Sequence, residues 1–302
     1  MKDHNNYEVI IIGGSYAGLA AAMALGRSLR RVLVIDGGKP CNRQTPHSHN
    51  FLTQDGETPQ RIAEKAKAQV LQYDTIQFYD GLAAKGAETE HGFEITTQAG
   101  DLFQAKKLLF ATGLTDQMPP IEGFAACWGI SVLHCPYCHG YEVRNQPIGL
   151  IGNGDMGFEF CRLISNWSKQ LTLFTNGPAT LTQEQRQKLA SYQIEVIEKE
   201  IGSFDQENGQ LQQVVFHDGT RKEVAAVFAR PAFAQHCNIP QQMGCELTEQ
   251  GLLLVDGFGR TTVPGVFAAG DNATMFRSVA NAVAEGTKAG AFINKELIEE
   301  AF

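Results

Sequence analysis

The feature that most constrains the fold is a pattern of strand, glycine loop and helix that occurs twice, beginning near residues 7 and 147. In each copy a short apolar run ends at glycines, a helix follows, and a second apolar run ends near residue 35 or 174. Short continuous apolar runs are typical of parallel strands buried on both faces. A βαβ unit of about 30 residues that opens with a glycine loop predicts a dinucleotide-binding domain. We therefore predict two such domains in tandem.

The segments that follow the two copies are also alike. Residues 92–111 alternate in polarity around a turn at 99–101, and a later meander carries turns at 208–209 and 218–219 before an apolar run at 225–229. These patterns predict antiparallel hairpins. The predicted fold class is α/β, with two tandem Rossmann-like domains of three-layer ββα architecture.

The length of 302 residues fits two domains. Nothing after residue 242 begins a third copy; this segment holds a strand that leads to Asp271 and a helix from about Ser278. We expect it to complete the first domain, which would comprise residues 1–115 and 243–302, with a second domain at 118–241. The proline-bearing stretches 115–120 and 237–242 are the expected hinges.

The second glycine loop is an intact GxGxxG motif formed by Gly152, Gly154 and Gly157. In such a loop the first glycine makes the turn, the second admits a pyrophosphate, and the third lets helix and strand approach. The next predicted strand ends at Thr175 and Asn176, which supply neither an acid for a ribose 2′-hydroxyl nor an arginine for a 2′-phosphate. Either neutral polar groups hold a nucleotide here, or nicotinamide binding has weakened or been lost.

The first glycine loop is less regular. It contains Gly13, Gly14 and Gly18, but Ser15 stands where the second glycine belongs. Asp36, at the end of the next predicted strand, supplies the carboxylate expected to accept a hydrogen bond from a ribose hydroxyl. The first domain is therefore predicted to bind a nucleotide.

Composition excludes several classes of protein. Hydrophobic residues make up 43% and charged residues 19%, as in a globular domain, and the net charge of −8 argues against binding to nucleic acid. No apolar run reaches the length of about 18 residues typical of a membrane-spanning helix, and residues 1–7 carry no apolar signal region. We expect a cytoplasmic protein that does not enter a membrane. Seven cysteines are too few for a disulfide scaffold.

The strongest chemical signal is the CxxC pair of Cys135 and Cys138, which is followed by His139. Two thiols at this spacing can close a disulfide, and CxxC geometry lowers a thiol pKa. A c-type haem attachment would require export, a structural zinc would need further ligands such as Cys127 and His134, and an inert buried pair is the third alternative. We favour redox use and expect no metal.

His139 is the first candidate for acid–base chemistry beside the thiols. An unperturbed imidazole pKa near 6.5 suits it to carry a proton near neutral pH. Glu142 lies three residues further on and could orient the imidazole if a helix begins here.

The order of these motifs resembles the low-molecular-weight thioredoxin reductase family of flavoproteins over essentially the whole chain. The resemblance rests on the first glycine loop, Ala-Thr-Gly at 111–113, the CxxC pair, and Gly-Val-Phe-Ala-Ala-Gly-Asp at 265–271. It implies one FAD per chain in the first domain, a homodimer, Cys138 as the thiol that faces the flavin, and Cys135 as the exchanging thiol. The residues expected to bind FAD are Gly13, Gly14, Ser15, Gly18, Asp36, Thr112, Gly113, Gly270, Asp271, Ser278 and Val279.

Two departures from ordinary thioredoxin reductases are similar to the dithiol oxidases of the gliotoxin and holomycin type. His139 follows the second cysteine where an Asp is usual, and Thr175 and Asn176 stand where a His-Arg-Arg stretch usually meets the NADPH phosphate. The stretch 49–56 also matches these oxidases, which makes His49 a rival catalytic base.

The resemblance implies an FAD-dependent thiol/disulfide oxidoreductase without strong NADPH dependence, whose partner is a small dithiol or disulfide or a thioredoxin-like protein. Three alternatives stay open: an NADPH-dependent thioredoxin reductase, a ferredoxin-linked reductase, and a flavin-bound redox sensor. NAD(P)H remains an open second cofactor.

Overall fold

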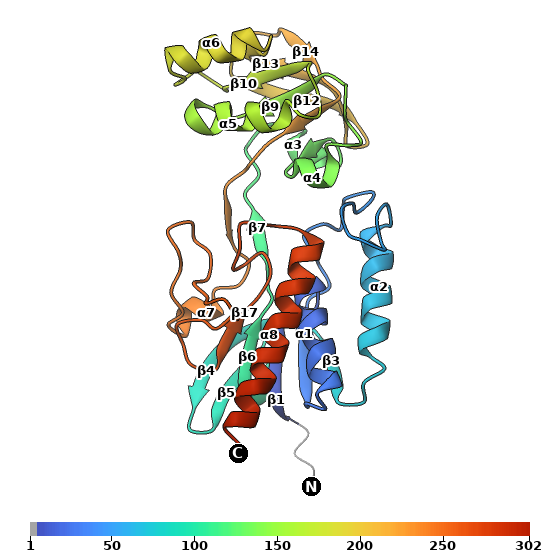
Figure 1. Cartoon of the computed structure of the whole chain (residues 1–302), viewed down its shortest axis with the longest axis vertical. Helices are drawn as coiled ribbons and strands as arrows, with labels where there is room; N and C mark the ends of the chain where they lie inside the picture. The colour runs from blue at the N-terminus through green and yellow to red at the C-terminus, as the bar shows by residue number, and fades with distance from the viewer. Residues whose placement is uncertain (1–4) are drawn as a thin grey trace.

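The computed structural model describes residues 5–302 and has two lobes along its length (Figure 1). The two ends of the described chain lie in one lobe, and the middle of the chain forms the other. Two short strands, β7 (Leu114–Asp116) and β16 (Phe233–Gln235), pair antiparallel where the chain passes between the lobes. Residues 1–4, part of the segment that was expected to lack a signal region, lie outside the described residues.

The first lobe is built on a seven-stranded sheet in the order β3-β2-β1-β6-β5-β4, with β17 beside β6. Its strands are β1 (Asn6–Ile12), β2 (Val32–Asp36), β3 (Ile76–Asp80), β4 (Ala83–Thr89), β5 (Gly92–Thr97), β6 (Leu102–Phe110) and β17 (Val266–Ala268). The pairs among β3, β2, β1, β6 and β17 are parallel, whereas β5 pairs antiparallel with both β4 and β6. The C-terminal segment therefore adds a strand to the first sheet.

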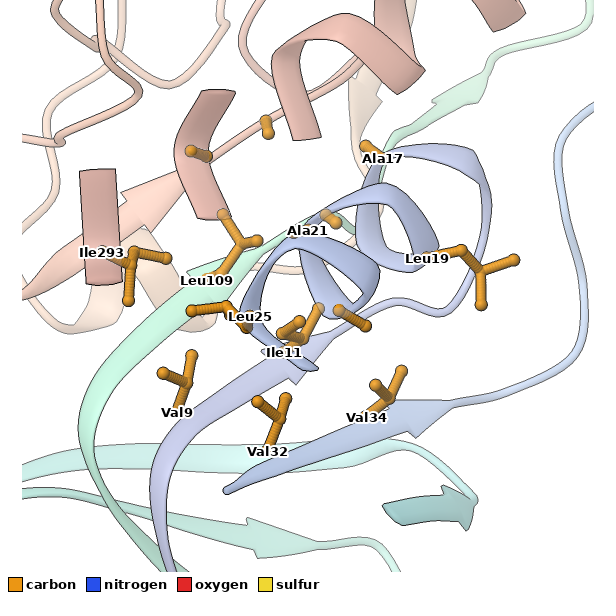
Figure 2. Close-up of a cluster of buried hydrophobic side chains, with 14 of the residues drawn as sticks. Val9, Ile11, Ala17, Leu19, Ala21, Leu25, Val32, Val34, Leu109 and Ile293 are labelled. Carbon is orange, nitrogen blue, oxygen red and sulfur yellow. The ribbon is translucent and has the colours of Figure 1, made fainter. Parts of the chain in front are cut away.

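Three helices pack on the first sheet through a common apolar core: α1 (Tyr16–Arg27), α2 (Pro59–Val70) and α8 (Val279–Glu299). Figure 2 shows Ile11, Val34 and Leu109 on the strands facing Leu25 of α1 and Ile293 of α8. Complete burial of a side chain of this size stabilises the fold by roughly 1.5–3 kcal/mol. This packing fixes the strand ends from which the site is built.

The second lobe repeats the plan with shorter elements. Its parallel sheet has the order β11-β10-β9-β15-β8 and is joined by a separate three-stranded antiparallel sheet. The strands are β8 (Val132–Leu133), β9 (Ile148–Ile151), β10 (Leu171–Phe174), β11 (Glu195–Ile197), β12 (Ile201–Glu207), β13 (Gln210–Phe216), β14 (Arg221–Glu223) and β15 (Ala226–Phe228). The helices are α3 (Phe124–Cys127), α4 (Pro136–His139), α5 (Gly154–Ile164) and α6 (Gln183–Ser191). The predicted α/β class with two Rossmann-like units is confirmed.

One expected hinge lies elsewhere. Residues 239–242 form a short helix, α7 (Ile239–Gln242), and Ile239 is buried in the apolar cluster on the first sheet together with Ile95. The return crossing between the lobes is therefore at β16, before residues 237–242. The proline at 240 suggested a linker, but burial of Ile239 holds this segment against the first sheet.

Two polar helices, α2 and α6, were not anticipated although each has a start signal. The Thr58 hydroxyl accepts a hydrogen bond from the Arg61 amide, and Thr182 forms a reciprocal capping box with Gln185. Such caps mark a helix start even where the apolar pattern is weak. Within residues 5–302, no helix is long and apolar enough to cross a membrane.

Candidate active site

A cavity of about 1380 Å³ lies where the carboxyl ends of β1, β2, β6 and β17 meet, and residues of both lobes line it. In open parallel sheets this edge is where ligands bind. The expected residues that line it are Gly13, Gly14, Ser15, Asp36, His49, Thr112, Gly113, Cys135, Cys138, His139, Gly270, Asp271, Ser278 and Val279. The sequence thus identified residues from both lobes that the fold brings to one cavity.

The first glycine loop is shaped by close backbone contacts. Gly13 has a φ of +103°, and a Cβ atom there would lie 2.3 Å from the Ala111 carbonyl oxygen. A Cβ atom on Gly18 would lie 1.9 Å from the Gly13 carbonyl oxygen. Gly18 does not line the cavity, because its place is the contact between α1 and this loop. The backbone packing of this loop therefore requires both glycines, whether or not a ligand binds.

The cavity has the polar groups that a flavin dinucleotide needs. Asp36 lies at the end of β2, where its Oδ1 accepts a hydrogen bond from the Gly14 amide at 3.0 Å and a second oxygen remains for a ribose hydroxyl. Asn42 also lines the cavity, and its buried Oδ1 has no hydrogen-bond partner within residues 5–302. A cavity larger than the usual 300–1,000 Å³ ligand pocket suits an extended dinucleotide.

The segment before α8 forms another part of the cavity wall. Burial raises the pKa of Asp271, and the neighbouring Arg277 opposes that shift. Ser278 caps α8 by accepting a hydrogen bond from the Asn281 amide, and Ser278 and Val279 both line the cavity. The positive end of this 21-residue helix is therefore at the cavity wall, where it favours negative charge.

Cys135 is the N-cap of the short helix α4 and Cys138 lies within it, on the side of the second lobe that faces the first (Figure 1). Their sulfur atoms are 3.0 Å apart, close enough for one thiol to donate a hydrogen bond to the other. This bond lowers the pKa of Cys135 below its usual range and raises that of Cys138, whose burial adds to the rise. Cys135 is therefore the sulfur that more readily carries the negative charge, which agrees with its expected role in exchange.

The two rival histidines lie next to each other although they come from different lobes. The rings of His49 and His139 have centroids 6.4 Å apart. Burial lowers the pKa of His139, Glu142 opposes this shift, and His49 adds to it. His139 is thus mostly neutral at pH 7 and can accept a proton from an incoming thiol.

Glu142 occupies a different place from the one expected. The helix α4 ends at His139, so Glu142 does not continue its face. Its Oε1 lies 3.6 Å from Nε2 of His49, whose Nδ1 is 3.7 Å from Oδ1 of Asp55. Glu142 therefore contacts the histidine of the other lobe, across the interface between the lobes.

A buried ion pair in this cavity was missed. The Arg277 guanidinium donates to both carboxylate oxygens of Asp116, at 2.7 and 3.0 Å, and its Nε lies 3.4 Å from Asp271. Asp116 is in β7, so this pair joins the wall of the cavity to the crossing between the lobes. The sequence signal was only a lone arginine before the predicted helix start.

His134 is a second residue that the sequence analysis left without a catalytic role. It lines the cavity directly before Cys135, and its ring meets that of Trp128 edge-on. Burial lowers the pKa of His134 to about 4, and Arg277 adds to the shift. The imidazole of His134 is therefore neutral near pH 7. Within residues 5–302, no cluster of His, Cys, Asp and Glu is arranged to hold a metal ion.

At the expected second nucleotide site, the polar side chains are hydrogen-bonded to other residues of the protein. The Thr175 hydroxyl donates to the Gly177 carbonyl oxygen at 2.6 Å, and Oδ1 of Asn176 accepts from the Ile201 amide at 2.7 Å. A Cβ atom on Gly157 would lie 2.8 Å from the Gly152 carbonyl carbon, so these glycines serve the approach of α5 to β9. The residues at the end of β10 support the loop itself.

Comparison with known proteins agrees with this arrangement. A family model described as pyridine nucleotide-disulphide oxidoreductase matches residues 7–286. The chain is 32% identical to thioredoxin reductase tcpT of Claviceps purpurea, over 99% of this chain and 97% of that protein. Thioredoxin reductase aclD of Aspergillus oryzae is 30% identical over 96% of both chains.

Solved structures share the whole fold. The putative thioredoxin reductase TrxB from Bacillus anthracis superposes with a TM-score of 0.94 at 33% identity, covering 98% of this chain and 100% of that one. The fold, the CxxC pair and the match over residues 7–286 lead to one conclusion. The chain belongs to the pyridine nucleotide-disulphide oxidoreductase family, and it is an FAD-dependent oxidoreductase of the thioredoxin reductase type.

Proposed function

We propose that this enzyme oxidises a small dithiol to a disulfide through Cys135 and Cys138, without a strong requirement for NADPH. The observation that carries the proposal is the position of the thiol pair in the same cavity as the residues expected to bind FAD, while the side chains of Thr175 and Asn176 are hydrogen-bonded to backbone groups of other residues in their lobe. The solved structure of HlmI shares the whole fold, with a TM-score of 0.93 at 31% identity over 100% of this chain and 95% of that one.

The chemistry starts from the disulfide form of the pair. A substrate thiolate attacks Sγ of Cys135, which forms a mixed disulfide and releases Cys138 as a thiolate. The second substrate thiol then attacks the substrate sulfur, which closes the product disulfide and releases Cys135. The low pKa of Cys135 makes it a good leaving group in this step.

Two protons leave the substrate in this exchange, and in the proposal the neutral imidazole of His139 accepts the first of them. His49 and Glu142 lie beside it as a route by which the proton can leave the cavity. Bound FAD supplies a two-electron acceptor for the reduced thiol pair, and molecular oxygen is the final acceptor in the proposal. Overall, one dithiol loses two protons and two electrons, which convert one molecule of oxygen to hydrogen peroxide.

The test is anaerobic reduction of the purified flavoprotein, followed by the loss of flavin absorbance. We expect dithiothreitol to bleach the flavin and NADPH to do so slowly, because a charge-assisted phosphate contact worth roughly 1.5–3 kcal/mol, or about 10–150-fold, is absent at Thr175 and Asn176. Fast, saturable reduction at micromolar NADPH would contradict the proposal. It would favour a thioredoxin reductase, the name carried by tcpT and aclD.

Cysteine variants separate the two sulfur roles. We expect Cys138→Ser to abolish bleaching by the dithiol, and Cys135→Ser to retain a thiolate at 138 that gives a charge-transfer band with the flavin. Cys245→Ala, a change at a cysteine buried outside the cavity, is the matched control and should bleach normally. A protein whose flavin responds to dithiols but which never turns over would be a redox sensor.

The remaining predictions concern the setting of the enzyme. We propose a small dithiol over a thioredoxin-like protein as substrate, a homodimer, and a cytoplasmic location. Steady-state oxygen consumption with dithiothreitol or reduced thioredoxin distinguishes the substrates. Light scattering of the purified holoenzyme measures the oligomeric state.

A further inference from the structure

Asn153, the second residue of the intact glycine motif, ties that loop to the segment after β10. Its Nδ2 donates to the Pro178 carbonyl oxygen at 2.9 Å, and its Oδ1 accepts from the Thr180 amide at 2.8 Å and lies 3.2 Å from the Thr180 hydroxyl. The same Oδ1 accepts from the Gly154 amide at 2.8 Å. One side chain thus bridges the two loops between which a Rossmann domain receives the ribose and pyrophosphate.

Thr180 takes the space that the motif normally leaves open. A Cβ atom on Gly154 would lie 2.8 Å from the Thr180 hydroxyl. Gly154 is the second glycine, whose missing side chain is what allows a pyrophosphate to reach the backbone. The Gly154 amide, a donor at the start of α5 that an anion would use, already donates to Asn153.

The segment that carries Thr180 is also tied on its other side. The Ala179 amide donates to Oε2 of Glu198 at 2.8 Å, and Arg186 donates to the Ala179 carbonyl oxygen at 3.3 Å. Arg186 and Glu198 form an ion pair at 2.7 Å. The guanidinium that lies beside this segment is therefore paired with a carboxylate of the chain.

We propose that Asn153 and Thr180 close the second glycine loop against NADPH and NADH, so that the GxGxxG motif here is a packing element and the nicotinamide cofactor of the wider family does not fit. Gly152 and Gly157 keep their role because α5 packs on β9 at these positions. One consequence of the inference rests on the proposed function: with no nicotinamide bound, electrons enter from a dithiol through the thiol pair of the second lobe.

The test measures binding of NADP⁺ and NAD⁺, which cannot reduce the flavin, to the oxidised holoenzyme by isothermal titration calorimetry. We expect no saturable binding to the wild type. The double variant Asn153→Gly/Thr180→Ala should bind at least one of the two nucleotides saturably, with a dissociation constant at least ten-fold below the highest nucleotide concentration at which the wild type shows no saturation. Asn166→Gly, in the turn after the same helix α5, is the matched control and should behave as the wild type.

Two results would overturn the inference: saturable micromolar binding of either nucleotide to the wild type, or no gain in a double variant that keeps its flavin and its unfolding temperature. Bleaching by dithiothreitol is measured in parallel to separate the two proposals. Nucleotide binding with intact bleaching overturns this inference and leaves the proposed function. Loss of bleaching by dithiol, without nucleotide binding, overturns the function and leaves the closed loop.

Discussion

The two glycine loops of this enzyme differ, and the loop that matches the GxGxxG motif less well is the one that opens onto the cavity. The first has Ser15 in place of a glycine, yet it opens onto a cavity of about 1380 Å³ with Asp36 at its edge. The second has all three glycines, yet Asn153 and Thr180 lie over it. The more regular motif therefore belongs to the loop whose second glycine faces Thr180 and not the cavity.

The comparison teaches that a glycine motif reports first on how closely a helix approaches a strand. Gly18 in the first loop and Gly157 in the second are both needed for this packing, whether or not a nucleotide binds. Binding depends on the neighbouring loops: Asp36 faces the cavity at the end of β2, whereas the Thr175 hydroxyl, just after β10, donates to the Gly177 carbonyl oxygen.

Substitution of the third glycine in each loop should give the largest difference between the two lobes. Gly18→Leu places a side chain 1.9 Å from the Gly13 carbonyl oxygen, so we expect loss of about 3 kcal/mol or more of unfolding free energy and colourless or unfolded protein. Gly157→Leu should also destabilise, through its contact with Gly152, but the protein that remains folded should keep FAD. Flavin absorbance per chain and urea unfolding measure both effects. Equal loss of flavin in both variants would contradict the comparison.

A second prediction compares what each lobe contributes to proton transfer. His139→Ala should retain FAD and lose dithiol turnover by roughly 10²–10⁴-fold, the usual scale of acid–base catalysis. His49→Ala, in the first lobe, should lose less because His49 acts through its neighbours. The measurement is steady-state oxygen consumption with dithiothreitol.

The pH dependence follows from the lowered pKa of His139. A base works when it is neutral, so its contribution rises with pH through a value below the usual 6.5 of histidine. Burial of the neutral form also means that stability falls as pH drops from 6.5 towards the folded pKa, because the unfolded chain binds the proton more readily. Near-wild-type rates for His139→Ala across pH 6–9, with large losses for His49→Ala, would assign the base to His49.

A smaller effect is expected at the two strand ends. Asp36→Asn removes the charge that strengthens a hydrogen bond to a ribose, so the affinity for FAD should fall by about 10–150-fold. Asn176→Ala at the corresponding place in the second lobe should leave that affinity unchanged. Titration of apoprotein with FAD, followed by flavin fluorescence, gives both constants. A similar loss in the two variants would mean that FAD binding does not depend on Asp36 in particular.

Local and periodic features of this chain were predictable from the sequence. The buried strands, the thiol pair and the return of the C-terminal segment follow from apolar runs, spacing and repetition. The contact of Glu142 with His49 and the pair of Arg277 with Asp116 were not, because each joins segments far apart in sequence across the two lobes. Asn153 appeared only as a spacer residue within its motif, since its partners lie 25 and 27 residues later.

The smallest predicted effect sharpens the comparison at Thr175. Thr175→Val keeps the shape of the side chain but removes the hydroxyl that donates to the Gly177 carbonyl oxygen. Because Thr175 is buried, an unpaired carbonyl remains, and we expect a loss of about 1–2 kcal/mol in the free energy of unfolding measured with urea. FAD content and bleaching by dithiothreitol should not change, since this hydroxyl supports a loop and contacts no cofactor. If stability were unchanged and the binding of NADP⁺ altered instead, the hydroxyl would face a nucleotide, and the two lobes would be more alike than their loops indicate.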